Sequence, residues 1–193
     1  MEMYKEFPTL ETKRLRMRKL TMEDAKDIFL YGSDNQVTRY VTWDTHENIE
    51  ESEKFVQYAL AQYEKKQLAP WGIERKEDGK MIGTIDFVSW NKKHGSAEVG
   101  YAISREYWGH GYVPEALQTL LELGFNEMEL VRISARCLKE NEQSKRVLEK
   151  VGMAYEGLIR KGMHLKGEYR DLCMYAILKE EYVQAKRGCL TVH

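Results

Sequence analysis

The stretch that decides the fold runs from Ala97 to Ala116 and reads AEVGYAISREYWGHGYVPEA. Residues 97–103 alternate, with apolar side chains at the odd positions, and this period of two predicts a strand. A short loop with Gly109 and Gly111 follows, and we expect a helix to begin at Pro114, where a missing N–H costs nothing. Glycines let the backbone approach a ligand, and the N–H groups of a helix N-terminus attract anions. The stretch therefore suits a pyrophosphate.

Three other interpretations of Gly109-x-Gly111 have to be weighed. A Walker A loop needs Gly-Lys-Ser/Thr after its spacer, and a dinucleotide fingerprint needs a Gly or Ala where Pro114 stands. Neither pattern is met. The third interpretation, a tight turn before a buried helix, needs no ligand at all. A second feature, Asn141 and Ser144 at the start of a later predicted helix, favours a ligand site.

Working outward toward the N-terminus, the periodicity predicts one strand, two helices and a hairpin. The residues 21–24 resemble a capping box, and Gly32 can end the helix that follows. The dipeptide Asp78-Gly79 is a strong hairpin signal. The expected elements are a strand over 11–18, a helix from 21 to 32, a helix over 48–66, and strands over 71–75 and 81–88.

Working outward toward the C-terminus, the pattern continues as helix, strand, helix and hairpin. Gly152 is placed to follow the end of a helix, and Lys166-Gly167 is a turn candidate. The expected elements are a helix over 117–128, a strand over 131–137, a helix over 141–151, strands around Leu158 and Met174, and a short charged helix. The mixture predicts an α/β (α+β) protein, and residues 1–193 are expected to form a single domain.

Composition narrows the function classes. The chain has 193 residues, and its 30 Lys and Arg nearly cancel its 31 Asp and Glu, so no general field favours nucleic acid or an anionic membrane. No stretch has the length and apolarity of a membrane span, so a cytoplasmic protein is expected. Cys137, Cys173 and Cys189 lack the spacing of zinc ligands or of a disulfide framework, and no metal is expected.

Taken in order, these motifs resemble the GNAT superfamily of acetyltransferases, and within it the branch that acetylates ribosomal-protein N-termini. The resemblance covers almost the whole chain. It implies a mixed, mostly antiparallel, splayed sheet of six to seven strands flanked by helices. The matching positions are Thr12, Arg14, Leu15, Arg18, Gly83, Ile85, 97–101, 107–113, Glu115, Ala116, Asn141, Ser144, Val147, 149–150, Gly152, Met153, Asp171 and Tyr175.

The resemblance implies acetyl-CoA as cosubstrate and assigns residues to it. The pantetheine would pair with the backbone of Tyr101, Ala102 and Ile103. The pyrophosphate would be held by Trp108, Gly109, His110, Gly111, Tyr112 and Val113. Two of these depart from the superfamily pattern: Trp108 replaces a Gln or Arg, so backbone amides must hold the anion, and Val113 replaces a small residue.

Acetyl transfer to an amine needs a base, a donor for the oxyanion and a proton for the leaving thiolate. Glu98 is the one ionisable residue on its face of the predicted strand, so it is the candidate general base, acting directly or through water. A backbone amide near Tyr101 would meet the oxyanion. Many GNAT enzymes carry a Tyr where this chain has Leu148, so Ser144 becomes the candidate partner of the thiolate. Asn141 would bond a pantetheine amide, although an Asn there is also an ordinary helix cap.

The acceptor is expected to be a primary amine. Trp43, Asp44 and Trp90 lie in regions that border the acceptor cleft of related folds, where an aromatic wall and an acid would suit a cation, although both Trp residues could equally be core. The leading hypothesis is a protein N-terminal α-amine. The alternatives are a polyamine, amino acid or antibiotic, or a CoA-binding module without catalysis. A monomer or homodimer is expected, without direct contact to nucleic acid or membrane.

Overall fold

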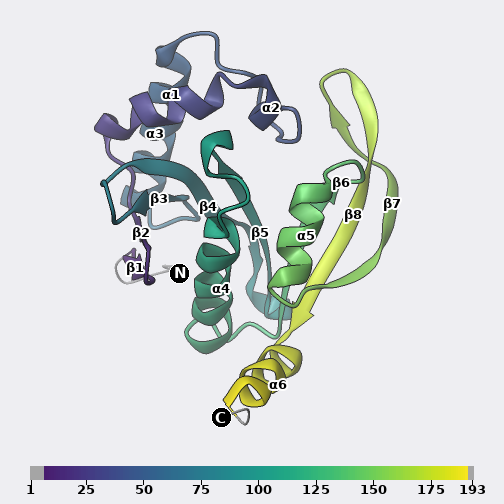
Figure 1. Cartoon of the computed structure of the whole chain (residues 1–193). Helices are drawn as coiled ribbons and strands as arrows, with labels where there is room; N and C mark the ends of the chain where they lie inside the picture. Colours follow the sequence, from purple (N-terminus) through teal and green to yellow (C-terminus); the bar gives the residue numbers. More distant parts are fainter. Residues whose placement is uncertain (1–6, 191–193) are drawn as a thin grey trace. The chain divides into compact units, whose positions relative to one another are not determined.

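The computed structural model describes residues 7–190, and side chains to residue 187. This part of the chain has a mixed α/β fold with eight strands and six α-helices (Figure 1). The strands form one mostly antiparallel sheet in the order β1-β2-β3-β4-β5-β6-β8-β7. The fold class predicted from the sequence is confirmed, with one strand more than the expected six to seven.

The extra strand arises because the predicted strand over 11–18 is a small hairpin. β1 (Leu10–Glu11) pairs antiparallel with β2 (Leu15–Arg18). The Thr12 hydroxyl accepts hydrogen bonds from the N–H of Arg14 at 3.3 Å and of Leu15 at 2.9 Å. A Ser or Thr side chain that bonds nearby backbone in this way favours a turn over a continuous strand.

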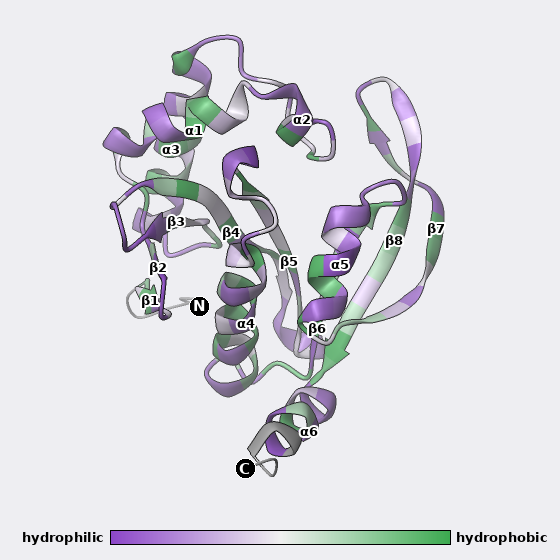
Figure 2. Ribbon diagram, viewed as in Figure 1, coloured by the Kyte–Doolittle hydropathy of each residue, from purple (hydrophilic) through white to green (hydrophobic). Residues whose placement is uncertain are grey.

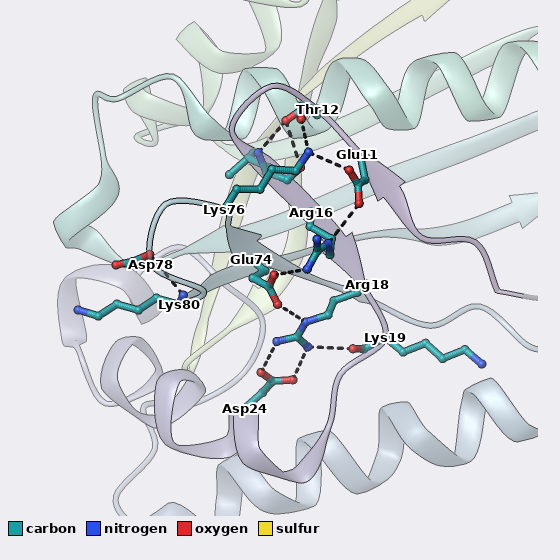
Figure 3. Close-up of polar contacts among 11 residues, drawn as sticks. Glu11, Thr12, Arg16, Arg18, Lys19, Asp24, Glu74, Lys76, Asp78 and Lys80 are labelled. Atoms are coloured by element: carbon teal, nitrogen blue, oxygen red, sulfur yellow. Dashed lines mark hydrogen bonds and ion pairs between the residues drawn. The ribbon is translucent and has the colours of Figure 1, made fainter.

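A chain of ion pairs ties this hairpin to the neighbouring strand (Figure 3). Arg16 contacts Glu11 at 3.2 Å and Glu74 at 3.1 Å. Arg18 contacts the same Glu74 at 2.6 Å and holds both oxygens of Asp24, at 2.8 and 2.9 Å. These hydrogen bonds and charges raise the pKa of Arg18. Every carboxylate in the chain of contacts therefore has a guanidinium partner.

Helices precede the central strands. The capping box of Thr21 and Asp24 is present and starts a 3-10 turn, η1 (Met22–Asp24). It leads into α1 (Ala25–Gly32), α2 (Asn35–Thr38) and α3 (Ile49–Glu64). The sequence pattern did not predict α2, because four residues are too few to show a helical period. These helices bury a core cluster of Leu20, Ala25, Ile28, Tyr31, Val37, Val56, Ala59, Tyr63, Ala69 and Met81.

The central strands match the predicted meander. β3 (Trp71–Arg75) and β4 (Met81–Asn91) are joined through Gly79, whose φ is 71°. β4 is longer than the predicted 81–88. A second 3-10 turn, η2 (Lys92–His94), ends at Gly95 with φ 57° and leads into β5 (Ser96–Ile103). After η3 (Arg105–Tyr107), α4 (Tyr112–Asn126) begins two residues before Pro114, which therefore stands within its first turn.

The C-terminal strands form a long hairpin. β6 (Arg132–Leu138) runs parallel to β5, with a register from Ser96–Arg132 to Glu98–Ser134, and antiparallel to β8 (Glu168–Leu178). β7 (Ala154–Leu165) pairs with β8 through Lys166 and Gly167, both with positive φ, as a two-residue I′ turn requires. α5 (Glu142–Lys150) and α6 (Lys179–Leu190) complete the fold. Figure 2 shows α5 mainly hydrophilic with short hydrophobic segments, and its buried side chain is Leu148.

The chain forms two compact units, each discontinuous in sequence. The first comprises Met1–Val88 and Gly100–Thr119, and the second comprises Ser89–Val99 and Leu120–His193. The boundaries fall inside β4, β5 and α4. A single domain over 1–193 therefore stays a prediction. No helix among residues 7–190 combines the length and apolarity needed to cross a membrane.

Candidate acetyl-transfer site

The glycine loop lies in the first unit, between η3 and α4. Gly109 and Gly111 have φ values of 78° and 77°, and a Cβ added at Gly109 would meet nothing within 4 Å. The N–H groups of Gly109, His110 and Gly111 have no hydrogen-bond acceptor among residues 7–190. Tyr112 and Val113 are buried, so their side chains point away from solvent. The first turn of α4 adds further N–H groups that a helix leaves unpaired. The loop is thus built as an anion nest.

An ion pair between Arg14, which directly precedes β2, and Glu115 of α4 supports the loop. Arg14 donates to the carbonyl of His110 at 3.0 Å and to Glu115 at 2.6 Å, and its guanidinium lies 4.4 Å from the centroid of the Tyr112 ring. Burial acts to raise the pKa of Glu115, but hydrogen bonds from Thr12 and Arg14 outweigh it and hold that pKa below its usual value. Arg14 thereby holds the carbonyl of His110 in place. The N–H groups of residues 109–111 have no acceptor among residues 7–190 and can meet a ligand.

The strand before the loop is held closely to β4. A Cβ at Gly83 would lie 2.3 Å from the carbonyl oxygen of Ala102, so only glycine fits there. The indole N–H of Trp108 donates to the carbonyl of Ile103 at 3.0 Å and ties the loop to the end of β5. Tyr101 and Ala102 are partly exposed, whereas Ile103 is buried.

Glu98 lies in the second unit. It stands opposite Ser134 in the register between β5 and β6, and Arg136 of β6 contacts its Oε1 at 2.8 Å. Its side chain is 18% exposed. The predicted general base is thus an ion-paired carboxylate that solvent still reaches.

Asn141 and Ser144 lie together at the start of α5, also in the second unit. Asn141 is the cap, because its Oδ1 accepts the N–H of Ser144 at 3.1 Å. The Ser144 side chain is hydrogen-bonded to the thiol of Cys137, whose pKa burial raises to about 11. Cys137 and Cys173 are buried free thiols that stand opposite each other in the register of β6 and β8. The Cys189 side chain lies outside the described part of the chain.

Comparison with known proteins identifies the family. A family model described as an acetyltransferase (GNAT) domain matches residues 14–154. The chain belongs to the GNAT acetyltransferases. It is 39% identical over 173 residues to the "Uncharacterized N-acetyltransferase YoaA" of Bacillus subtilis, with 90% of this chain and 98% of YoaA covered. A GNAT acetyltransferase structure from Bacillus anthracis matches with a TM-score of 0.80 and 32% identity, over 90% of this chain and 99% of that one.

Two further GNAT relatives carry named activities. The spermidine N(1)-acetyltransferase of Escherichia coli K12 is 25% identical over 170 residues, which cover 88% of each chain. The ribosomal L7/L12 alpha-N-protein acetyltransferase RimL, solved with coenzyme A, matches with a TM-score of 0.78 and 20% identity over 89% of this chain and 98% of RimL. The first is a sequence relative, and the second shows the shared fold. This GNAT chain is an N-acetyltransferase that acts on amines.

The residues predicted to border the acceptor of this GNAT chain belong to both units. Trp43 is partly buried against the core cluster of the first unit, with ring centroids 6.5 Å from Tyr31 and 5.1 Å from His46, and Asp44 beside it is exposed. Trp90 belongs to the second unit, where the Lys92 ammonium lies 4.2 Å from its ring centroid. Their contact with an acceptor stays a prediction.

The sequence did not predict the ion pair of Arg14 with Glu115 or the partly buried Asp86. Arg14 and Glu115 were noted only as matching positions, and nothing in their spacing reveals that they meet. Asp86 is a single acid within the apolar strand MIGTIDFV, which is a signal that could have been noticed. Burial raises the pKa of Asp86 to about 7.

A cavity of about 440 Å³ lies in the first unit, apart from the residues predicted to react. Its wall comprises Asp27, Leu30, Asp34, Lys80, Met81 and Ser104–Tyr107. Asp34 is paired with Arg105 at 2.7 Å, and Asp27 accepts the N–H of Met81 at 3.1 Å. Asp27, Asp34 and Arg105 are therefore already engaged by groups of the protein. No group of three His, Cys, Asp or Glu within the described residues is arranged to hold a metal ion.

Proposed function

We propose that this protein transfers the acetyl group of acetyl-CoA to a primary amine by direct attack on the thioester. The observation that carries the proposal is the loop of Gly109 and Gly111, whose N–H groups have no acceptor within residues 7–190 and which opens directly into α4. Unpaired N–H groups and a helix N-terminus together favour a pyrophosphate.

The donor's parts each have a candidate partner. The loop from Trp108 to Val113 would bind the pyrophosphate, and the backbone of Tyr101–Ile103 would pair with the pantetheine. Asn141 uses its Oδ1 for the cap, so its side-chain N–H groups stay available for a pantetheine carbonyl. The exposed Gly109 and the partly exposed Gly111, Tyr101 and Ala102 leave room for these contacts.

The chemistry requires that a proton leave the amine and that the thiolate be stabilised. The sequence proposes Glu98 for the first role and Ser144 for the second. Ser144 already forms a hydrogen bond with a sulfur, that of Cys137, so its hydroxyl is suited to a thiolate of similar character. Glu98 has one oxygen on Arg136 and the other without a partner among the described residues. A hydrogen bond to a water or an amine is open to that second oxygen.

A protein N-terminal α-amine is the first acceptor to test. An α-amine has a pKa of about 8, so a useful fraction is neutral near pH 7 without help. A polyamine is the second candidate, because the spermidine acetyltransferase of E. coli is a relative over 88% of this chain. The exposed carboxylate of Asp44 would suit a second ammonium of such a substrate.

The test is thiol release from acetyl-CoA with a panel of amines, followed by mass spectrometry of the products. The panel contains peptides with free Ala or Ser termini, the same peptides with blocked termini, spermidine and free lysine. We expect thiol release above the buffer rate for at least one free amine, with the acetyl group on nitrogen. Release at the buffer rate for every amine would refute catalysis and leave a CoA-binding module.

Donor binding is tested with Gly109→Asp and with Gly79→Asp as its matched control. Both glycines have positive φ, 78° and 71°, and an added Cβ meets nothing within 4 Å at either. The two variants should therefore lose similar stability, roughly 1 kcal/mol. Only Gly109→Asp places a carboxylate in the anion nest, so we expect its Kd for coenzyme A, measured by calorimetry, to rise at least tenfold. Equal Kd values for the two variants would move the pyrophosphate elsewhere.

A further inference from the structure

Among residues 7–190, Asp86 of β4 has no partner of opposite charge. It is partly buried, and burial alone raises its pKa from the usual 3.8 to about 7. Within residues 7–190 its carboxylate forms no hydrogen bond and no ion pair. A buried structural carboxylate is normally paired or hydrogen-bonded, because an unpaired one costs free energy. This carboxylate therefore requires an explanation other than stability.

Space for the Asp86 carboxylate comes from Gly100 of β5. A Cβ added at Gly100 would lie 3.3 Å from Oδ1 of Asp86 and 2.7 Å from Cγ1 of Val88. Gly100 does not have the positive φ that would itself demand glycine. The absence of a side chain at Gly100 thus makes room for the Asp86 carboxylate, which lies directly beside the backbone of β5.

That position is next to the segment proposed to bind the donor. Gly100 is followed at once by Tyr101, the first residue of the stretch assigned to the pantetheine, and one residue advances a strand by only about 3.3 Å. An amine that attacks a thioester held along Tyr101–Ile103 would therefore come within reach of Asp86. Asp86, Gly100 and Tyr101–Ile103 all belong to the first unit.

The groups around Asp86 leave its proton affinity high. From α3, Tyr63 interacts with its charge, and from α1, Tyr31 is hydrogen-bonded to Thr84, which is two residues away on β4. Burial raises the pKa of Tyr63 to about 12 and raises that of Tyr31, so both stay neutral. On β3, Trp71 and Gly72 stand opposite the two residues before Asp86, and on β5 its neighbour is Gly100. No Lys, Arg or His in the described part of the chain contributes to the pKa of Asp86.

We infer that Asp86, beside Gly100, is the catalytic base that takes the proton from the acceptor ammonium. This inference rests on the proposed acetyl transfer and replaces Glu98 in that role. One oxygen of Glu98 is held by the Arg136 guanidinium, whereas the Asp86 carboxylate has no hydrogen-bond or ion-pair partner among residues 7–190.

In the proposed reaction, Asp86 takes one proton from the ammonium, and the nitrogen lone pair forms a bond to the thioester carbonyl carbon. The C–S bond breaks with its electron pair on sulfur, and the second proton of the nitrogen is transferred to that thiolate. The products are the amide and coenzyme A as a thiol, and Asp86 releases its proton to solvent before the next turnover.

The experiment compares kcat/KM against pH for the wild type, Asp86→Asn and Glu98→Gln. Glu122→Gln is the matched control, because Glu122 is 54% exposed and pairs with Lys186 within the second unit, whereas Asp86 belongs to the first. With the best amine, we expect the wild type, Glu98→Gln and Glu122→Gln to share a rising limb near pH 7. Asp86→Asn should lose that limb and fall at least about 100-fold at pH 8. Carboxyl-carbon NMR of the wild type should show one Asp that titrates near pH 7 and is missing in Asp86→Asn.

The outcomes separate the inference from the function on which it rests. If the wild type acetylates no amine, the proposed function fails and the base assignment fails with it. If the wild type is active and Asp86→Asn keeps both rate and limb, only the base assignment is overturned. If Glu98→Gln loses the limb instead, Glu98 is the base. Circular dichroism of each variant shows whether a lost rate reflects lost fold.

Discussion

Two regions of the same sheet treat their carboxylates in opposite ways. The carboxylates of Glu11 on β1, Glu74 on β3 and Asp24 in η1 all contact guanidinium groups of β2 (Figure 3). On β4, Asp86 is partly buried and has no such partner within residues 7–190. Paired charges hold strands together, whereas an unpaired carboxylate destabilises the fold and is kept for another purpose. The presence of a guanidinium partner thus distinguishes the structural acids from the candidate catalytic one.

The largest expected effect comes from breaking the paired region. Asp24 is 5% exposed and holds Arg18 through both oxygens, so Asp24→Asn should lower the free energy of unfolding by about 3 kcal/mol. Urea denaturation at pH 7 measures the loss. Arg16→Gln is the control, because Arg16 is 46% exposed and exposed pairs contribute only about 0.5 kcal/mol. A loss below about 1 kcal/mol for Asp24→Asn would contradict a structural role.

The second effect has the opposite sign. The pKa of Asp86 is raised from 3.8 to about 7 in the folded protein, so folding takes up a proton between pH 4 and pH 7. Wild-type stability should therefore fall as the pH rises through that window and level off above it. Asp86→Asn avoids the buried charge and should be more stable than the wild type at pH 8. A shift of this size corresponds to about 4 kcal/mol, and partial exposure reduces the expected gain to about 2 kcal/mol.

Urea denaturation at pH 4 and pH 8 checks both the size and the sign. The gain of Asp86→Asn over the wild type should shrink toward pH 4, where the wild-type carboxyl is protonated in the folded state and about half protonated in the unfolded state. Asp24→Asn should lose stability at pH 8, where Asp86→Asn gains it. An Asp86→Asn variant that is less stable than the wild type at pH 8 would mean that Asp86 has a favourable partner after all.

Much of the fold could be predicted because it rests on local chemistry. Asp78-Gly79 and Lys166-Gly167 require turns whatever the rest of the chain does, and both carry the positive φ that such turns need. Gly152, with φ 88°, follows α5 as expected. The first predicted strand was wrong in one respect, since its alternating residues continue through Thr12. The side-chain hydrogen bonds of Thr12 decide the turn, and periodicity does not report them.

Less of the site could be predicted, because it depends on contacts between distant residues. The glycine loop was visible as a motif, but its support by Arg14 joins residues about a hundred positions apart. Glu98 was chosen because it is alone on its face of one strand, and the sequence could not show that Arg136 reaches it. The same reasoning on β4 would have found Asp86. What separates the two acids is the partner, which only the fold supplies.

The third effect is the smallest in stability and bears directly on the space beside Gly100. In Gly100→Ala, the new Cβ would lie 2.7 Å from Cγ1 of Val88 and 3.3 Å from the Asp86 carboxylate. Because one side chain must shift, we expect a loss of about 1 kcal/mol in unfolding free energy. Crowding of the carboxylate should also lower kcat/KM at pH 8 at least about tenfold.

The double variant Gly100→Ala, Val88→Ala separates these two consequences. Removing Cγ1 of Val88, which is 49% exposed, relieves the shorter contact and should restore most of the stability. The contact between the new Cβ and Asp86 is unchanged, so kcat/KM should stay low. If kcat/KM recovers together with stability, the room beside Gly100 serves only the packing of Val88. If kcat/KM stays low, the absence of a side chain at Gly100 makes room for the Asp86 carboxylate. Asp86 then differs from the paired acids of β1, β3 and η1 in the space kept beside it as well as in its charge partners.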